Sequence, residues 1–274
     1  MAANQINGAT QIASGTVTRS RHNTATSGSA VITKVIAGTN TSISSTGADA
    51  GTGDVTVNIP SPLTAGLTLI AGTSAIAPLK FTSGTSLTTA AAGALEYDGT
   101  AFYASMAAST RGVLSTAQWA VLSSAYTLTS QTAAQKLFNS STNGAVTLPV
   151  GTYEFECEFS LTAMSATSGS FGFALGGAAT FTQEWTAIAD KSALAVAASP
   201  QMTFNTAANT TLATASIATT GVARVRGIIR VTVAGTVIPQ VSLGVAAAAI
   251  VGVNSFFRIA QIGGSSVTTV GNWS

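Results

Sequence analysis

The sequence predicts an all-β protein made of three successive regions, and three observations support this prediction. Short segments of alternating apolar and polar residues recur along the chain, and Gly, Pro, Ser and Thr clusters separate them. The sequence contains neither heptads nor an alternation of strand and helix patterns. Bulky side chains are scarce in the first half of the chain and common in the second. We therefore expect a polar arm, a thin stranded shaft and a compact β head.

Residues 1–30 are predicted to form an N-terminal arm. They are rich in Thr, Ser and Asn and have almost no large apolar side chain, so they lack the apolar area that would offset the entropy of ordering. Such a segment orders on contact with a partner. Arg19 and Arg21, with His22 beside them, are the candidates for docking this arm on an acidic surface of a larger particle.

Residues 31–125 are predicted to form a shaft of short strands, in which several chains wrap together because one chain has too few large side chains for a core. Tyr97–Thr100 has the Asp-Gly signature of a hairpin turn. Residues 107–124 fit either a short helix capped by Ser115 or a linker. The expected strands of this region are 31–36, 41–45, 55–59, 67–70, 79–82 and 94–97.

Residues 126–274 are predicted to form a globular β-sandwich, because many short strand patterns follow one another at nearly regular spacing. Pro and Gly residues punctuate them. The expected strands are 126–130, 136–138, 145–148, 152–162, 169–175, 181–186, 201–204, 211–217, 223–233, 237–243 and 255–262.

Two strand patterns in this region concentrate the charges of the chain. Three glutamates alternate with Phe155, Cys157 and Phe159, and three arginines have the same parity against apolar neighbours such as Val225 and Ile229. We expect the two charged faces to meet, within one sheet or between subunits, and to set register and partner choice; the alternative is two solvated strands. These interface or register candidates are Glu154, Glu156, Glu158, Arg224, Arg226 and Arg230.

The composition favours a chain that is covered by other copies of itself or anchored in a larger particle. Only 7% of the 274 residues are charged, against about 25% in ordinary soluble domains, and the formal net charge is +2. No basic cluster accompanies the positive balance, which argues against nucleic-acid binding. No apolar stretch reaches the roughly 20 residues that a membrane-spanning helix needs.

The residues also argue against catalysis, cofactors and metal ions. His22 is the only histidine and has no core to hold it in place. Asp49 and Asp54 flank a Gly-rich turn but lack the further acids of a calcium loop. Glutamates two residues apart stand side by side on one strand face rather than opposite each other across a scissile bond. Cys157 has the apolar parity of its strand and is expected to be a buried, inert thiol.

Several stretches resemble known modules. VIAGTNTSISSTGADAGTGDVTVNI and PLKFTSGTSLTTAAAGALEYDGTAFYAS are each similar to a module found in many tail-fibre and virion-structural proteins of tailed bacteriophages. The stretches LPVGTYEFECEFSLT, VRGIIRVTVAGTVIPQVSLG and NSFFRIAQIGGS resemble the trimeric jelly-roll domain at the ends of phage fibres, which is similar in fold to tumour necrosis factor.

The resemblance implies a non-enzymatic homotrimer in a virion, with its N-terminus attached to other virion proteins and its jelly-roll head pointing outward. The implied role is assembly or attachment to a host-surface molecule. The alternative is a capsid decoration protein that stabilises the shell. A polysaccharide-degrading spike is a poor match, because the sequence has neither a regular coil repeat nor enough acidic residues.

Overall fold

A computed structural model describes residues 42–45, 55–58, 69, 71–192, 200–205, 209–271 and 273. The chain divides into two compact units, Met1–Lys80 and Phe81–Ser274. In the first unit, β1 (Ser42–Ser45) pairs with β2 (Val55–Asn58) as an antiparallel hairpin. The predicted strand at 31–36, the Asp49–Asp54 turn and the docking candidates Arg19, Arg21 and His22 all lie outside the described residues.

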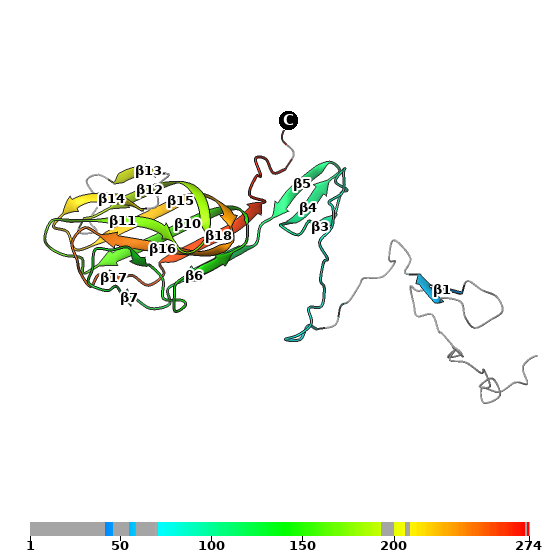
Figure 1. Cartoon of the computed structure of the whole chain (residues 1–274), viewed down its shortest axis with the longest axis horizontal. Helices are drawn as coiled ribbons and strands as arrows, with labels where there is room; N and C mark the ends of the chain where they lie inside the picture. The colour runs from blue at the N-terminus through cyan, green and yellow to red at the C-terminus, as the bar shows by residue number, and fades with distance from the viewer. Residues whose placement is uncertain are drawn as a thin grey trace, which may run out of the picture. The chain divides into compact units, whose positions relative to one another are not determined.

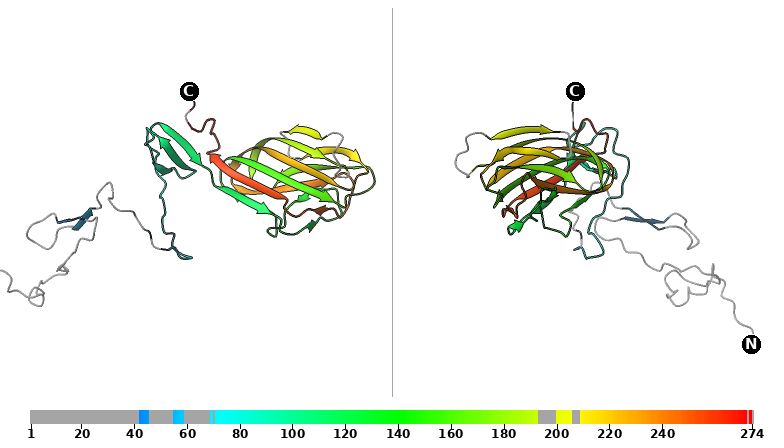
Figure 2. Two further views of the ribbon diagram at one scale, coloured as in Figure 1. Left: turned by 180° about the vertical axis from the view of Figure 1, so that it is seen from behind. Right: turned by 60° about the vertical axis from the view of Figure 1, so that its left-hand side comes forward.

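Most of the second unit is a sandwich of two antiparallel sheets (Figures 1 and 2). The larger sheet has eight strands in the order β13-β12-β15-β10-β17-β7, and β18 also pairs with β10 and carries β6 on its other side. These strands are β6 (Ala117–Val121), β7 (Tyr126–Thr127), β10 (Gly151–Thr162), β12 (Thr180–Asp190), β13 (Gln201–Asn205), β15 (Gly221–Val233), β17 (Ile250–Val251) and β18 (Phe256–Gly263).

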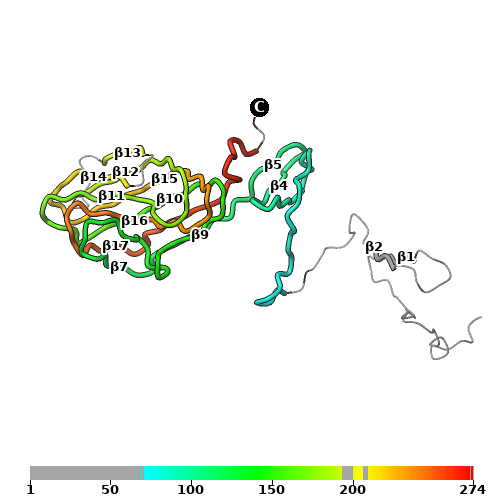
Figure 3. The backbone as a smooth tube through the Cα atoms, in the orientation of Figure 1, coloured from blue at the N-terminus to red at the C-terminus, as the bar shows by residue number. Residues whose placement is uncertain are grey.

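The smaller sheet has five strands in the order β14-β11-β16-β8, and β9 pairs with β16 beside β8. Successive long strands alternate between the two sheets, so the chain repeatedly crosses from one layer to the other, as the tube in Figure 3 shows. These strands are β8 (Gln135–Lys136), β9 (Val146–Leu148), β11 (Gly169–Gly176), β14 (Asn209–Ser216) and β16 (Gly235–Leu243).

The core between the sheets is built from the residues that face inward at every second strand position. Phe155 of β10 stacks with Phe173 of β11 at 6.5 Å between ring centroids, and Phe173 meets Trp185 of β12 edge-on at 5.5 Å. Buried aromatic side chains remove a large apolar area from water and therefore contribute strongly to the stability of a core. Cys157 is fully buried as predicted, and burial raises the pKa of its thiol.

A separate three-stranded sheet precedes the sandwich in the second unit. It consists of β3 (Leu95–Tyr97), β4 (Phe102–Ala107) and β5 (Thr110–Leu114), which pair in sequence order. The predicted Asp-Gly turn joins β3 to β4, with φ +93° at Gly99. Tyr97 stacks on Phe102 at 4.5 Å, so the two strands are also joined by an aromatic pair.

The all-β prediction is confirmed for the described residues, which contain no helix, and hence none long and apolar enough to cross a membrane. Every strand expected within residues 126–274 has a counterpart, and only the two-residue β17 was missed. Two predictions were wrong. Residues 79–82 form no strand, and residues 107–124 form neither a helix nor a linker. Their alternating pattern instead builds β5 and β6, and β6 joins the larger sheet through β18.

Candidate functional site

The glutamate strand and the arginine strand meet within one sheet. They are β10 and β15, paired so that Glu156 lies directly across from Arg226 and Glu158 from Arg224. Directly opposite residues share a face, so the carboxylates and guanidinium groups lie together on the side of the larger sheet that faces away from the core. We call this side the outer face. The two charged strands therefore meet within one sheet of the protomer.

The ion pairs run diagonally rather than straight across. Arg224 donates to the Glu156 carboxylate from Nε at 2.7 Å and also from Nη2. This hydrogen bonding and the charge of Glu156 raise the pKa of Arg224. Glu154 instead accepts from Arg258 Nη2 at 3.1 Å. Arg258 lies on β18, on the other side of β10, and the sequence analysis missed it, although it occupies an outward position of a predicted strand.

The expectation that all three arginines of β15 balance the glutamates needs correction. Arg230 lies across from Thr152, beyond the last glutamate of the row. Its Nη1 donates to Thr152 Oγ1 at 3.1 Å and to the carbonyl oxygens of Ser265 and Val267 at 3.1 and 2.6 Å. Arg230 therefore holds the segment after β18 against the sheet. Arg226 forms no ion pair with any described residue.

Apolar side chains flank this ionic strip on both sides. Cross-strand registers place Ile188 next to Arg224 and Met202 next to Ile188, and Phe204 lies on the same edge of the sheet. Met202 and Phe204 are 77% and 64% exposed. On the opposite edge, Trp119, Val121 and Phe256 form the second flank, in which the rings of Trp119 and Phe256 lie 5.6 Å apart. Contiguous exposed apolar side chains are uncommon on monomeric soluble proteins and are typical of interaction sites.

A hollow of about 540 Å³ opens in the outer face beside the first flank. Its lining combines the phenyl ring of Phe204, the unpaired guanidinium of Arg226, and the side chains of Thr182, Glu184 and Ile228. The outer face is thus apolar at its edges, ionic at its centre and recessed where the two meet. Aromatic residues, Met and Arg, which are enriched in protein interfaces, occur together on this face.

The Glu156–Arg224 pair is expected to help fix the register of β10 and β15. Reversing one charge, by Glu156→Arg or by Arg224→Glu, puts like charges on adjacent strands, so each single variant should lower the melting temperature slightly. The double variant should restore most of that loss. Circular dichroism melts of the four proteins test this, and an Arg226→Gln variant is the control, because Arg226 forms no ion pair with any described residue and the substitution adds no like charge. Equal melting of single and double variants would contradict the pairing.

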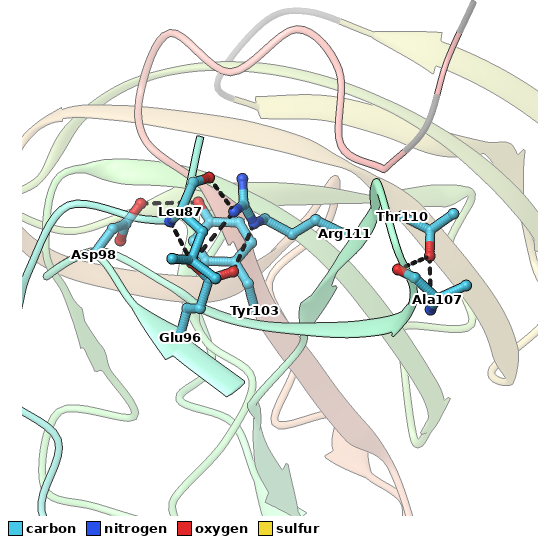
Figure 4. Close-up of polar contacts among 7 residues, drawn as sticks. All are labelled: Leu87, Glu96, Asp98, Tyr103, Ala107, Thr110 and Arg111. Atoms are coloured by element: carbon cyan, nitrogen blue, oxygen red, sulfur yellow. Dashed lines mark hydrogen bonds and ion pairs between the residues drawn. The ribbon is translucent and has the colours of Figure 1, made fainter. Parts of the chain in front are cut away.

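A second polar cluster holds the three-stranded sheet together (Figure 4). Glu96 accepts from the backbone N–H of Leu87 at 2.6 Å and from Arg111 Nε at 2.9 Å, and Arg111 Nη2 donates to the Leu87 carbonyl at 2.5 Å. Asp98 accepts from Tyr103 and from two backbone N–H groups of its own turn. These bonds tie residues 87–111 together where the sheet has almost no buried side chains.

This cluster makes the three-stranded sheet sensitive to acid. The hydrogen bond from the Leu87 N–H, and to a smaller extent Arg111, lower the pKa of Glu96. Burial alone would raise the pKa of Asp98, but the hydrogen bonds that its carboxylate accepts outweigh burial, so the pKa of Asp98 is also lowered. A carboxylate with a lowered pKa stabilises the fold above its unfolded-state pKa, and this contribution is lost as the pH falls through its folded value. We expect amide exchange of residues 87–111 to accelerate below about pH 4, beyond the intrinsic pH effect. Glu96→Gln should weaken this dependence; an unchanged profile would contradict it.

The described residues contain no group of three or more His, Cys, Asp or Glu side chains that is placed to hold a metal ion. Comparison of the chain with protein-family models, with curated proteins and with solved structures finds no match in any of the three.

Proposed function

We propose that this protein is a non-enzymatic structural subunit of a bacteriophage virion, a trimeric fibre or spike with its N-terminal arm on the particle and its β head outward. The observation that carries the proposal is the outer face, where two exposed apolar flanks enclose an ionic strip. A solitary head would leave these side chains in water. Copies of the head that cover one another's outer faces remove the apolar flanks from water and keep the ions at the contact.

The strand order of the sandwich supports a jelly-roll head. If the β12–β13 hairpin is set aside as an insertion, the order is β6-β18-β10-β15 in one sheet, and β14, β11 and β16 precede the short β8 and β9 in the other. Consecutive long strands then alternate between the layers, apart from β11 and β14, which are neighbours in the smaller sheet. Crossing between two four-stranded layers in this way is typical of the two Greek keys of a jelly roll. The β12–β13 hairpin then widens one sheet beyond β15, and its Met202 and Phe204 extend the outer face.

The oligomeric part of the proposal is tested by mass. Size-exclusion chromatography with light scattering should give about 81.6 kDa, three times the 27.2 kDa of one chain. A folded 27.2 kDa species at micromolar concentration would overturn the trimer.

The virion part is tested by location. Antibodies against the head should label purified particles that contain the chain, at a tail or collar position for a fibre or spike. Labelling spread over the capsid surface would instead identify a decoration protein, and absence of the chain from particles would overturn a virion role. Binding of the isolated trimer to host cells would assign attachment rather than assembly.

A further inference from the structure

A groove of about 360 Å³ opens at the side of the sandwich, between the edge of the larger sheet at β6 and the edge of the smaller sheet at β9. Strand β6 is labelled in Figure 1 and β9 in Figure 3, and they belong to the larger and the smaller sheet respectively. Gln118, Trp119 and Ala120 line it on one side, and Ala145, Val146 and Thr147 on the other. Side chains alternate along a strand, so three consecutive residues can line one groove only where the backbone edge of the strand faces it.

The hydrogen-bond ladders confirm that both edges carry free backbone groups. Leu122 N–H donates to the Ser255 carbonyl on the β18 side. The N–H and C=O groups of successive strand residues point to opposite sides, so Trp119, three positions before Leu122, points its N–H and C=O away from β18. The Thr236 carbonyl accepts from Ala179 N–H on the β11 side, so Thr147, which lies across from Thr236, points its N–H and C=O away from β16. Among the described residues, β6 pairs with β18 alone and β9 with β16 alone.

The groove has an apolar floor and a rim that is polar but uncharged. Its floor consists of Phe138, Phe257 and Ile259, which are core residues of the sandwich, and the rim carries the hydroxyl groups of Ser140 and Ser141. No charged side chain lines it. Proteins usually protect exposed strand edges with charged residues, proline or a bulge, and β6 and β9 have none of these within their bounds.

We propose that this groove binds an extended, uncharged peptide strand of a partner protein, which adds to the edges of β9 and β6 and closes the side of the sandwich. The free N–H and C=O groups supply the main-chain hydrogen bonds of strand addition, and the apolar floor receives every second side chain of the incoming strand. The absence of charge in the lining excludes charged side chains from the inward positions, because the groove offers them no counter-ion.

The probe is a capped, neutral peptide, Gly-Ser-Val-Thr-Val-Ser-Gly, labelled with a dye and followed by fluorescence anisotropy against the full-length protein. Thr147→Pro removes the N–H that Thr147 presents to the groove and leaves the bonds from β9 to β16 in place. Thr147→Ala is the matched control, since it changes the side chain and keeps the N–H. The loss of a main-chain hydrogen bond predicts about tenfold weaker binding to Thr147→Pro than to Thr147→Ala.

Hydrogen exchange locates the bound peptide independently. The amides of Trp119 and Thr147 should become protected when the peptide is added. A peptide N-methylated at its central Val-Thr-Val, whose N–H groups point to both sides of the strand, should protect neither. Equal affinity of the two Thr147 variants, or no binding to the wild-type protein at about 1 mM peptide, would overturn the proposal. Thr147 lies on the smaller sheet, so light scattering of the same variants reports separately on the proposed trimer.

Discussion

Replacing Gly227 with alanine is expected to destabilise the sandwich strongly, because the added methyl group has no room between the central strands. Gly227 lies in the middle of β15, between Phe155 of β10 and Trp185 of β12. A Cβ atom at this position would lie 2.3 Å from the carbonyl oxygen of Glu184 and 2.4 Å from Cβ of Trp185. Neither atom belongs to a flexible side-chain end, so the central strands must move apart. We expect a loss of at least about 3 kcal/mol.

A strand glycine without such a close approach provides the control for this experiment. A Cβ atom on Gly112 of β5 would have its nearest neighbour 4.0 Å away, at the Ala104 carbonyl oxygen. Thermal unfolding is followed by circular dichroism at one protein concentration. Relative to the wild-type protein, Gly227→Ala should melt roughly 6–12 °C lower, and Gly112→Ala should melt at almost the same temperature. Similar melting of both variants would show that β12 does not approach β15 this closely.

The sequence was most informative about residues whose role depends on parity along one strand. The alternation of Glu154, Glu156 and Glu158 with buried partners correctly predicts which side of β10 faces the core, and the same holds for Val225 and Ile229 of β15. Val233 is the exception. It has the inward parity but is 56% exposed, because it is the last residue of β15, beyond the sandwich core.

Features that depend on which strands become neighbours could not be predicted in the same way. Arg258 forms an ion pair with Glu154 because β18 lies beside β10, and Arg230 donates hydrogen bonds to the segment after β18. Both contacts join residues that are far apart in the sequence. The helix considered for residues 107–124 failed for a related reason. The short pattern around Trp119 and Leu122 fits a helix or a strand, and pairing with β18 decides between them.

Introducing two carboxylates by mutation on the first apolar flank of the outer face is expected to dissociate the trimer. Met202 and Phe204 are the most exposed large side chains of this flank, and both project from the edge strand β13. If copies of the head cover this flank, Met202→Asp with Phe204→Asp replaces buried apolar area by two carboxylates that lose their hydration. Interface residues of this kind contribute about 2 kcal/mol or more each, so their joint loss weakens association roughly a thousandfold.

The control for the double variant is Ile217→Asp. Ile217 is 75% exposed but lies in the connection between β14 and β15, outside the outer face as it is defined by the larger sheet. Light scattering at micromolar concentration should give about 27.2 kDa for the double variant, and three times that mass for the wild-type protein and for Ile217→Asp. Because β13 is an edge strand and both residues point to solvent in the protomer, circular dichroism should show an intact fold. A double variant that keeps the trimer mass would mean that the copies meet through another surface, and one that unfolds would mean that the head is stable only as part of the assembly.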